Sequence, residues 1–398
     1  MRRVLSGLEC FVRDGPGAAG LAAGCRLGLV AHAASIDAAG EHAIQLVGGM
    51  RGVRLARLFA PEHGLYGHEQ DMEAVSETVD RVSGLPVTSL YGHDPSSLTP
   101  DRGRLAGLDA IVFDCQDVGS RYYTYLATLS LVMEAARAAG VRVVVLDRPN
   151  PLGGLALEGP VLDPRLRSFV GRFPLPVRHG MTAGELARLF NDSFGIGCDL
   201  RVVALEGWRR TMGFAETGLP WVPPSPNMPA PSTALVYPGG CLVEGTNLSE
   251  GRGTTTPFEL VGAPWLDSMA LVDALRAERL PGVAFRAASF RPMFHKYAGE
   301  ACRGAQVIVR DSACFRPFAT YLVLLREARR LAPGAFAWRA EPYEFETARP
   351  AIDLLLGRAE LRPLLERGAT LDEMERLWEG DLAAFDRLRR GALLYGEP

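Results

Sequence analysis

Charged and amide side chains follow three short apolar runs of the chain. Ala60–Gly67 contains Glu62 and His63, Asp114–Tyr122 contains Asp114, Gln116 and Arg121, and Asp147–Gly154 contains Arg148 and Asn150. A pocket that holds a sugar needs carboxylates and amides for the hydroxyls, arginine for any acid group, and aromatic faces for the apolar ring surface. These three segments supply all of those groups.

A second polar concentration spans Tyr237–Phe258, where glycines alternate with Glu244, Asn247, Glu250 and Arg252. Glycine permits backbone conformations and close approaches that other residues resist, and such loops often carry function. A phosphate-binding glycine loop is disfavoured, because Gly-Lys-Ser/Thr is missing and two glutamates would repel an anion. The dinucleotide fingerprint G-x-G-x-x-G is also missing after the first apolar run, so we expect no nucleotide cofactor.

Several of these residues also have ordinary structural explanations. Glu62 is equally consistent with a surface carboxylate or an ion-pair partner of Arg57. Asp114 and Asp117 are typical of loops closed by Asx turns, and Arg121 and Arg148 are natural ion-pair partners for them. The residue types alone leave these alternatives open.

No convincing metal-ligand spacing is present. The seven cysteines are widely separated and form no C-x-x-C pair, and His63 and His68 fit ordinary loop histidines. We therefore predict reduced, mostly buried thiols and no metal site.

The elements that position these groups are predicted from apolar runs. Continuous apolar segments alternate with helical patterns, which is typical of a parallel sheet covered by helices on both faces. The predicted strands are Arg26–Ala31, Val53–Phe59, Pro86–Leu90, Ala110–Phe113 and Arg142–Leu146. In such a Rossmann-like α/β sheet, functional groups collect beyond the carboxyl ends of the strands.

Helices are predicted at Tyr122–Ala139 and, from the capping box Thr182-Ala-Gly-Glu185, up to about Asn191. The proline-dense stretch 219–232 sustains neither helix nor central strand, so a domain boundary is predicted there. The first domain is then 1–228, and a smaller α+β domain spans 229–398. That second domain has a predicted strand at Gln306–Arg310 and helices at Phe318–Leu331 and within 371–390.

Composition narrows the classes of partner. The 398 residues are 47% hydrophobic with a net charge of −3, which argues against a nucleic-acid-binding face. Glu9, Arg13 and Asp14 interrupt any apolar core near the start, so neither a signal peptide nor a membrane span is predicted. We expect a cytoplasmic protein that binds a small molecule. Its oligomeric state is not indicated.

The polar motifs resemble those of the exo-β-N-acetylmuramidase family, over about Leu27 to Tyr395. The segments that carry the resemblance include Leu58-Phe-Ala-Pro-Glu-His-Gly-Leu-Tyr-Gly67, Val112-Phe-Asp-Cys-Gln-Asp-Val-Gly-Ser-Arg-Tyr-Tyr-Thr-Tyr125, Leu146-Asp-Arg-Pro-Asn-Pro-Leu-Gly-Gly154, Leu219-Pro-Trp-Val-Pro-Pro-Ser-Pro-Asn-Met-Pro229 and Glu244-Gly-Thr-Asn-Leu-Ser-Glu-Gly-Arg-Gly-Thr-Thr255. The resemblance implies a Rossmann-like domain, a smaller second domain, and an active site in the cleft between them. It also implies release of N-acetylmuramic acid from the non-reducing end of peptidoglycan fragments, in cell-wall turnover or recycling.

Glycoside hydrolysis normally uses two carboxyl groups, one as proton donor and one as base or nucleophile. Under this resemblance we predict that Glu62 and Glu244 face each other across the domain interface. Glu250 and Glu158 are alternative candidates for the catalytic carboxylates. Asp114 is a candidate for orienting either carboxylate by a hydrogen bond. Which glutamate is the acid, and whether the reaction retains or inverts configuration, is left open.

Muramic acid carries a lactyl carboxylate, which calls for an arginine, and both Arg121 and Arg252 fit. Tyr122, Tyr125 and Trp265 are candidates for ring stacking or ordinary core packing. The complete set of predicted substrate-binding residues is His63, Asp114, Gln116, Arg121, Tyr125, Asn227, Asn247, Glu250 and Arg252.

Two other functions remain open. Glu62, His63, His68 and Asp114 are also the residue types of a metal-dependent amidase or deacetylase acting on muropeptides. A non-catalytic protein that binds muropeptides is the second alternative.

Overall fold

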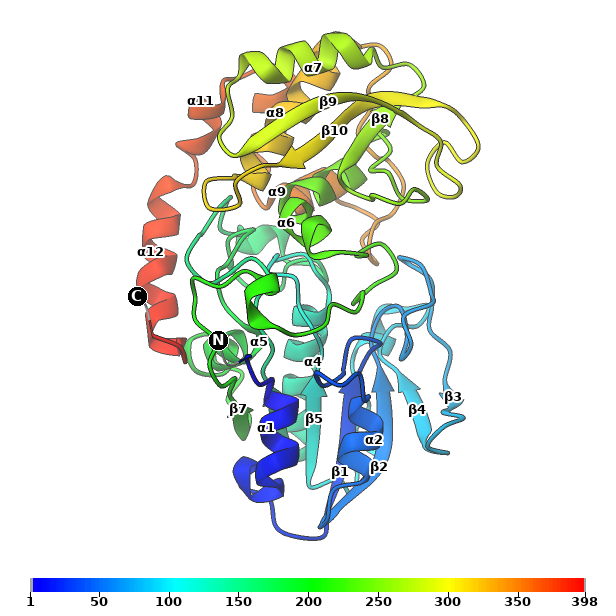
Figure 1. Cartoon of the computed structure of the whole chain (residues 1–398), viewed down its shortest axis with the longest axis vertical. Helices are drawn as coiled ribbons and strands as arrows, with labels where there is room; N and C mark the ends of the chain where they lie inside the picture. The colour runs from blue at the N-terminus through cyan, green and yellow to red at the C-terminus, as the bar shows by residue number, and fades with distance from the viewer. Residues whose placement is uncertain (1–2, 397–398) are drawn as a thin grey trace.

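A seven-stranded sheet forms the lower half of the molecule in Figure 1. The structure is a computed structural model, and it describes residues 3–396. The strand order is β3-β4-β2-β1-β5-β6-β7, and every neighbouring pair is parallel except β3 with β4. Its strands are β1 (Cys25–Ala31), β2 (Val53–Ala60), β3 (Thr78–Val79), β4 (Pro86–Ser89), β5 (Ala110–Asp114), β6 (Arg142–Leu146) and β7 (Leu200–Val203).

Helices cover both faces of this sheet. Val144 packs in one apolar cluster with α1 (Gly7–Asp14) and α2 (Ala43–Gly48). Val145 packs in another with α4 (Tyr125–Ala139) and α5 (Ala183–Arg188). Successive strand residues point to opposite faces, so strands covered on both sides are apolar throughout. The predicted Rossmann-like parallel sheet is confirmed.

A smaller antiparallel sheet lies above the first in Figure 1. Its order is β8-β10-β9, with β8 (Leu260–Ala263), β9 (Val283–Phe290) and β10 (Cys302–Val309). The helices of this half are α6 (Pro231–Gly240), α7 (Ser268–Ala277), α8 (Pro317–Leu331), α9 (Ala351–Leu356), α10 (Leu361–Glu366) and α11 (Leu371–Glu375).

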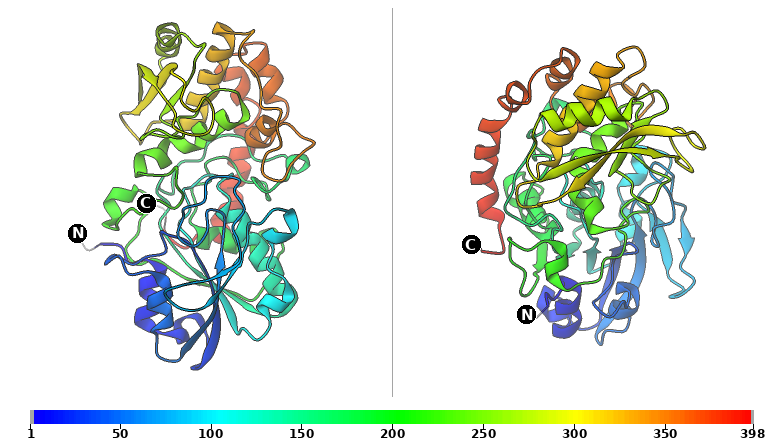
Figure 2. Two further views of the ribbon diagram at one scale, coloured as in Figure 1. Left: turned by 90° about the vertical axis from the view of Figure 1, so that its right-hand side faces the viewer. Right: turned by 45° about the horizontal axis from the view of Figure 1, so that its top comes forward.

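The last helix, α12 (Glu379–Arg389), runs back along the side of the molecule toward the first sheet (Figure 1, Figure 2). Arg389 donates hydrogen bonds to the carbonyls of Gly154 and Gly180, each at 3.0 Å. The hydroxyl of Tyr395 donates to Asp147 at 2.6 Å. The chain end therefore fastens the two halves together, and the proposed division at 228/229 stays a prediction.

Some predicted element bounds differ from the structure. The helix expected from Tyr122 begins at Tyr125, because the preceding residues pair with another segment: Arg121 N–H donates to Val177 O at 2.9 Å. The strand expected at Gln306–Arg310 begins at Cys302, since all of β10 pairs with β9. The capping box of Thr182 and Glu185 is present, but α5 ends at Arg188 and continues as a π-helical turn.

Within residues 3–396, none of the helices is long and apolar enough to cross a membrane.

Candidate active site

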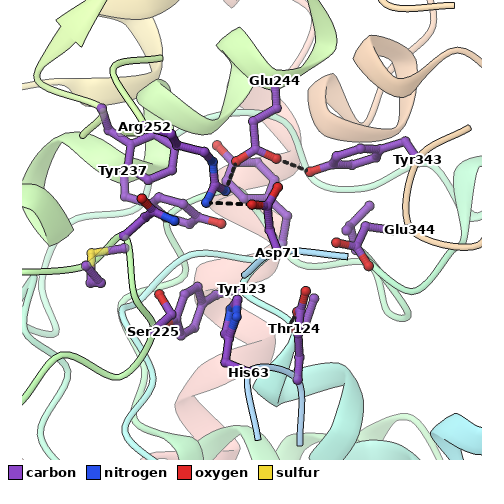
Figure 3. A pocket seen from close by; sticks show the side chains of 16 residues that line it. His63, Asp71, Tyr123, Thr124, Ser225, Tyr237, Glu244, Arg252, Tyr343 and Glu344 are labelled. Carbon is purple, nitrogen blue, oxygen red and sulfur yellow. Dashed lines mark hydrogen bonds and ion pairs between the residues drawn. The ribbon is translucent and has the colours of Figure 1, made fainter. Parts of the chain in front are cut away.

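A pocket lies beyond the carboxyl ends of the parallel strands, between the two sheets (Figure 3). It encloses about 440 Å³ of free space, part of it open to solvent. Segments from both halves of the chain contribute to it. The lining residues are Glu62, His63, Asp71, Tyr122, Tyr123, Thr124, Val170, Ser225, Asn227, Met228, Tyr237, Glu244, Arg252, Phe258, Tyr343 and Glu344.

Glu62 stands just past the end of β2 and is 3% exposed. One of its oxygens accepts a hydrogen bond from Thr124 Oγ1 at 2.5 Å, and the other accepts from Met72 N–H at 3.3 Å. Arg57 instead donates to Thr88, so the ion pair considered for Glu62 does not form. His63 follows with a φ of 68°, a left-handed conformation that is uncommon outside glycine and often found at functional sites.

Glu244 enters the pocket from the side opposite His63 (Figure 3). It lies in the 3₁₀ turn Cys241–Gly245 and is 5% exposed. Tyr343 donates a hydrogen bond to Glu244 at 2.7 Å, and Arg252 binds its other oxygen at 2.8 Å. A Cβ at position 245 would lie 2.9 Å from Ile352 Cα, so glycine is required for this turn to pack as it does.

Arg252 is surrounded by three carboxylates. Glu244 lies at 2.8 Å, Asp71 at 3.1 Å and Glu250 at 3.3 Å. Burial pushes the pKa of Asp71 upward, but Arg252 and His295 outweigh it and hold that pKa well below its ordinary value. Arg252 thus joins Asp71, from the loop after β2, to the glycine-rich loop.

Glu344 is a fourth carboxylate in the pocket. Tyr91 donates a hydrogen bond from its hydroxyl to Glu344 at 2.8 Å. Burial, followed by the negative charge of Glu62, raises the pKa of Glu344 well above its ordinary value. Its φ of 48° is again left-handed. The neutral acid is therefore the favoured form of Glu344 beside Glu62.

The structure brings part of the predicted set together. Glu62, His63, Asn227, Glu244 and Arg252 line the pocket. Glu250 lies behind Arg252 and binds Lys296 at 3.0 Å. The remaining predicted residues, Asp114, Gln116, Arg121, Tyr125 and Asn247, do not line it.

Asp114 and Arg121, the two charged residues of the remaining set that does not line the pocket, bind other partners. Asp114 forms a buried ion pair with Arg148 at 2.6 Å, as the structural alternative expected for an aspartate at this place. Arg121 donates to the carbonyls of Pro160 and Leu355, each at 2.7 Å. Arg121 therefore serves packing between the halves, which leaves Arg252 as the arginine at the pocket.

The three uncharged members also have structural partners. Gln116 donates to the carbonyls of Asp117 and Pro149, at 2.7 and 2.8 Å. The Tyr125 hydroxyl donates to Pro224 O. Asn247 pairs with the backbone of residues 335 and 337.

Sequence reasoning missed Asp71, Tyr343 and Glu344. Tyr343 and Glu344 lie in an irregular segment without apolar periodicity or a preceding strand. A partial signal was available at Asp71, which closes the polar stretch that begins with Glu62.

The ligand set of the metal-dependent alternative is not assembled. His63 lines the pocket, whereas Asp114 is buried against Arg148, and the His68 side chain is 72% exposed and paired with Glu69. Among residues 3–396, no group of three or more His, Cys, Asp or Glu side chains is arranged to hold a metal ion.

Two family models together cover most of the chain. One is described as the N-terminal part of exo-beta-N-acetylmuramidase NamZ and matches residues 27–232, and the C-terminal part matches 235–395. The chain belongs to the NamZ family of exo-β-N-acetylmuramidases, and so to the glycoside hydrolases. A curated NamZ relative, the peptidoglycan beta-N-acetylmuramidase of Bacillus subtilis (strain 168), is 42% identical over 372 residues, which is 94% of this chain and 87% of the relative.

Solved structures agree with this membership. A DUF1343 family protein (BF0371) from Bacteroides fragilis NCTC 9343 has a TM-score of 0.88 and 31% identity, with 99% of each chain covered. A second such protein from the same strain (BF0379) has a TM-score of 0.76 and 26% identity, with 100% of each chain covered. The fold that this chain shares with these two proteins therefore extends over nearly its whole length.

Proposed function

We propose that this chain removes N-acetylmuramic acid from the non-reducing end of peptidoglycan fragments by two-carboxylate chemistry. One observation carries the proposal: Glu62, from the first sheet, and Glu244, from the glycine-rich loop, line the same pocket. Hydrolysis of a glycosidic bond needs such a pair, one carboxyl to protonate the leaving oxygen and one ionised. The family membership and the name of the Bacillus subtilis relative support muramyl saccharides as the substrate class.

The surroundings of the two glutamates support different roles. Glu244 is ion-paired with Arg252, an arrangement that suits an ionised carboxylate. Glu62 forms no ion pair with a cation of residues 3–396, and it lies beside the Glu344 carboxyl, which keeps a proton that the two groups can share. We assign Glu62 as the proton donor to the leaving oxygen and Glu244 as the ionised partner.

The ionised partner can act as base, as nucleophile, or by orienting the 2-acetamido group of the substrate. NMR of the first anomer released distinguishes inversion from retention. An α-anomer from the β-linked substrate supports Glu244 as base. A β-anomer supports a covalent intermediate or participation by the acetamido group.

Other pocket residues fit the binding of a muramyl ring. His63 and Asn227 offer polar atoms at the wall, and Tyr123, Tyr237 and Tyr343 offer ring surface. We propose that the lactyl carboxylate of the substrate lies nearest Arg252, because the Arg121 guanidinium is already bonded to backbone carbonyls. Since three carboxylates already surround Arg252, its first effect is to hold Glu244 in place.

The experiment uses an aryl β-N-acetylmuramide beside the matching N-acetylglucosaminide, each with and without a chelator. The proposal expects release from the muramide only, at a rate that the chelator does not change. Equal release from both sugars would overturn the substrate assignment, and no release from either sugar would favour the amidase class or the non-catalytic binder.

We place this activity in the recycling of wall fragments in the cytoplasm. Fractionation of the source cells, with the chain followed by antibody, tests the location. Recovery of the chain with the cell wall or medium would overturn it.

A further inference from the structure

A groove lies next to the pocket, on the surface of the second half. It is lined by Thr246, Asn247, His295, Lys296, Tyr297, Ala337, Trp338, Arg339, Ala340 and Glu341. Its free space is about 1110 Å³, compared with about 440 Å³ in the pocket. An exo-acting enzyme holds the terminal sugar in its pocket, so the rest of a longer substrate lies outside the pocket.

The same chain segments line the pocket and the groove. Glu244 faces the pocket, and Thr246, two residues later, faces the groove. Tyr343 and Glu344 line the pocket, while Trp338 to Glu341 of the same loop line the groove. The two cavities are therefore neighbours built on shared loops.

Side-chain contacts join them again at Asp71 and Met72. Asp71 lines the pocket and lies 3.4 Å from Nε2 of His295, which lines the groove. Met72 donates its N–H to Glu62, and its sulfur lies 3.9 Å from Arg339 of the groove. The groove is therefore joined to Glu62 through one residue, Met72, and to Glu244 through two, Asp71 and Arg252.

Two aromatic rings of the groove are held in fixed positions. Trp338 donates its indole N–H to Glu366 at 2.8 Å and packs edge-on against Phe336. Tyr297 accepts a hydrogen bond from the Trp265 indole at 3.1 Å. Both rings are only partly buried. Amphipathic rings that are preoriented and half exposed are suited to the apolar face of a sugar.

Cationic residues outnumber acidic ones in the groove lining, where Glu341 is the single acidic residue. Lys296 is paired with Glu250 and His295 with Asp71. Arg339 has no carboxylate partner among residues 3–396. The hydrogen bond to Asp71 raises the pKa of His295, so its ring keeps a positive charge to higher pH. His295 and Tyr297 have φ values of 70° and 57°, a strained backbone of the kind found at binding sites. These charges favour an anionic group on the ligand.

We propose that this groove binds the leaving part of the substrate: the sugar beyond the cleaved bond stacks on Trp338 and Tyr297, and a carboxylate farther along lies against His295 and Arg339. The inference rests on the proposed function. The carboxylate belongs either to the lactyl group of the next muramyl unit or to its peptide stem, and both sources share the same chemistry.

The test compares kcat/KM for three muramides: the aryl glycoside, a muramyl saccharide with free lactyl groups, and the same saccharide with a peptide stem. The wild type is expected to prefer the saccharides over the aryl glycoside. Trp338→Ala is expected to reduce the ratio of saccharide to aryl kcat/KM at least tenfold, through KM, and Trp338→Phe to restore most of it.

The peptide arm identifies the carboxylate. A gain with the stem assigns His295 and Arg339 to stem carboxylates. A loss assigns them to the lactyl group, because the amide bond to the stem consumes the lactyl carboxylate, and equal kcat/KM values would overturn the carboxylate contact. Leu388→Ala, at an exposed position in a different groove, is the matched control and should leave the ratio unchanged.

An unchanged ratio of saccharide to aryl kcat/KM in a folded Trp338→Ala protein would contradict binding of the leaving part in this groove. The proposed function would remain intact. No turnover of any muramide by the wild type would overturn both.

Discussion

Tyr91 and Glu344 are 253 positions apart, and their side chains join the two halves of the chain through a hydrogen bond of 2.8 Å. Tyr91 follows β4 of the first sheet, whereas Glu344 lies on the loop that separates the pocket from the groove. Burial, followed by the negative charge of Glu62, raises the pKa of both residues. The contact between the two halves therefore includes a pocket carboxyl whose neutral form is favoured.

Replacing Glu344 with Gln tests whether this carboxyl influences Glu62. Glutamine keeps an acceptor for Tyr91 and resembles the neutral acid, but it cannot ionise at high pH. In the wild type, ionisation of Glu344 places a negative charge beside Glu62, and such a charge opposes loss of the proton that Glu62 must donate. The alkaline limb of kcat/KM should therefore move to lower pH in the variant. Identical pH profiles would show that Glu344 has no such influence.

Replacing Arg252 with Met should damage both stability and activity. The change leaves Glu244, Asp71 and Glu250 buried without the guanidinium between them. Removing one partner of a buried ion pair costs about 3 to 5 kcal/mol. Denaturant unfolding measures the loss, and Arg252→Lys, which keeps a charge, should lose less. A loss below about 1 kcal/mol for Met would contradict the role given to this network.

Glu158 should make stability depend on pH. Burial, opposed by a hydrogen bond from Ala319 N–H, raises the pKa of Glu158 to about 7. Between about pH 4.5 and 7 the unfolded chain has released this proton while the folded chain keeps it. Stability therefore falls as pH rises through this window, by up to about 3 kcal/mol.

The variant Glu158→Gln cannot titrate and should lack this part of the decline. Urea unfolding at pH 4.5 and 7 measures it. The pKa of Asp147 is raised to about 6 by burial and contributes in the same direction, so some slope should remain. An unaltered slope would mean that Glu158 does not hold its proton in the folded state.

The sequence was most informative where strands determine position. The run Arg142–Leu146 forms β6 with the predicted bounds, because a strand buried on both faces must be apolar throughout. Glu62 was predicted at a strand end, and it does face the pocket, since the carboxyl ends of parallel strands meet at one edge.

Side-chain direction within loops could not be predicted in the same way. Asp114 also stands at a strand end, yet it turns toward Arg148 instead of the pocket. Asn247 lies three residues after Glu244 but bonds to the backbone near Ala337. Glu344 was missed because its placement depends on a left-handed backbone and on Tyr91, and neither leaves a local pattern.

The most direct test of the central claim is kcat/KM of Glu62→Gln and Glu244→Gln on the aryl β-N-acetylmuramide, with thermal unfolding to verify the fold. Loss of an acid or base group typically costs about 10²- to 10⁴-fold in rate. We predict that each variant stays folded and is at least about a hundredfold slower. Turnover within about tenfold of the wild type in both folded variants would contradict the assignment of this pair.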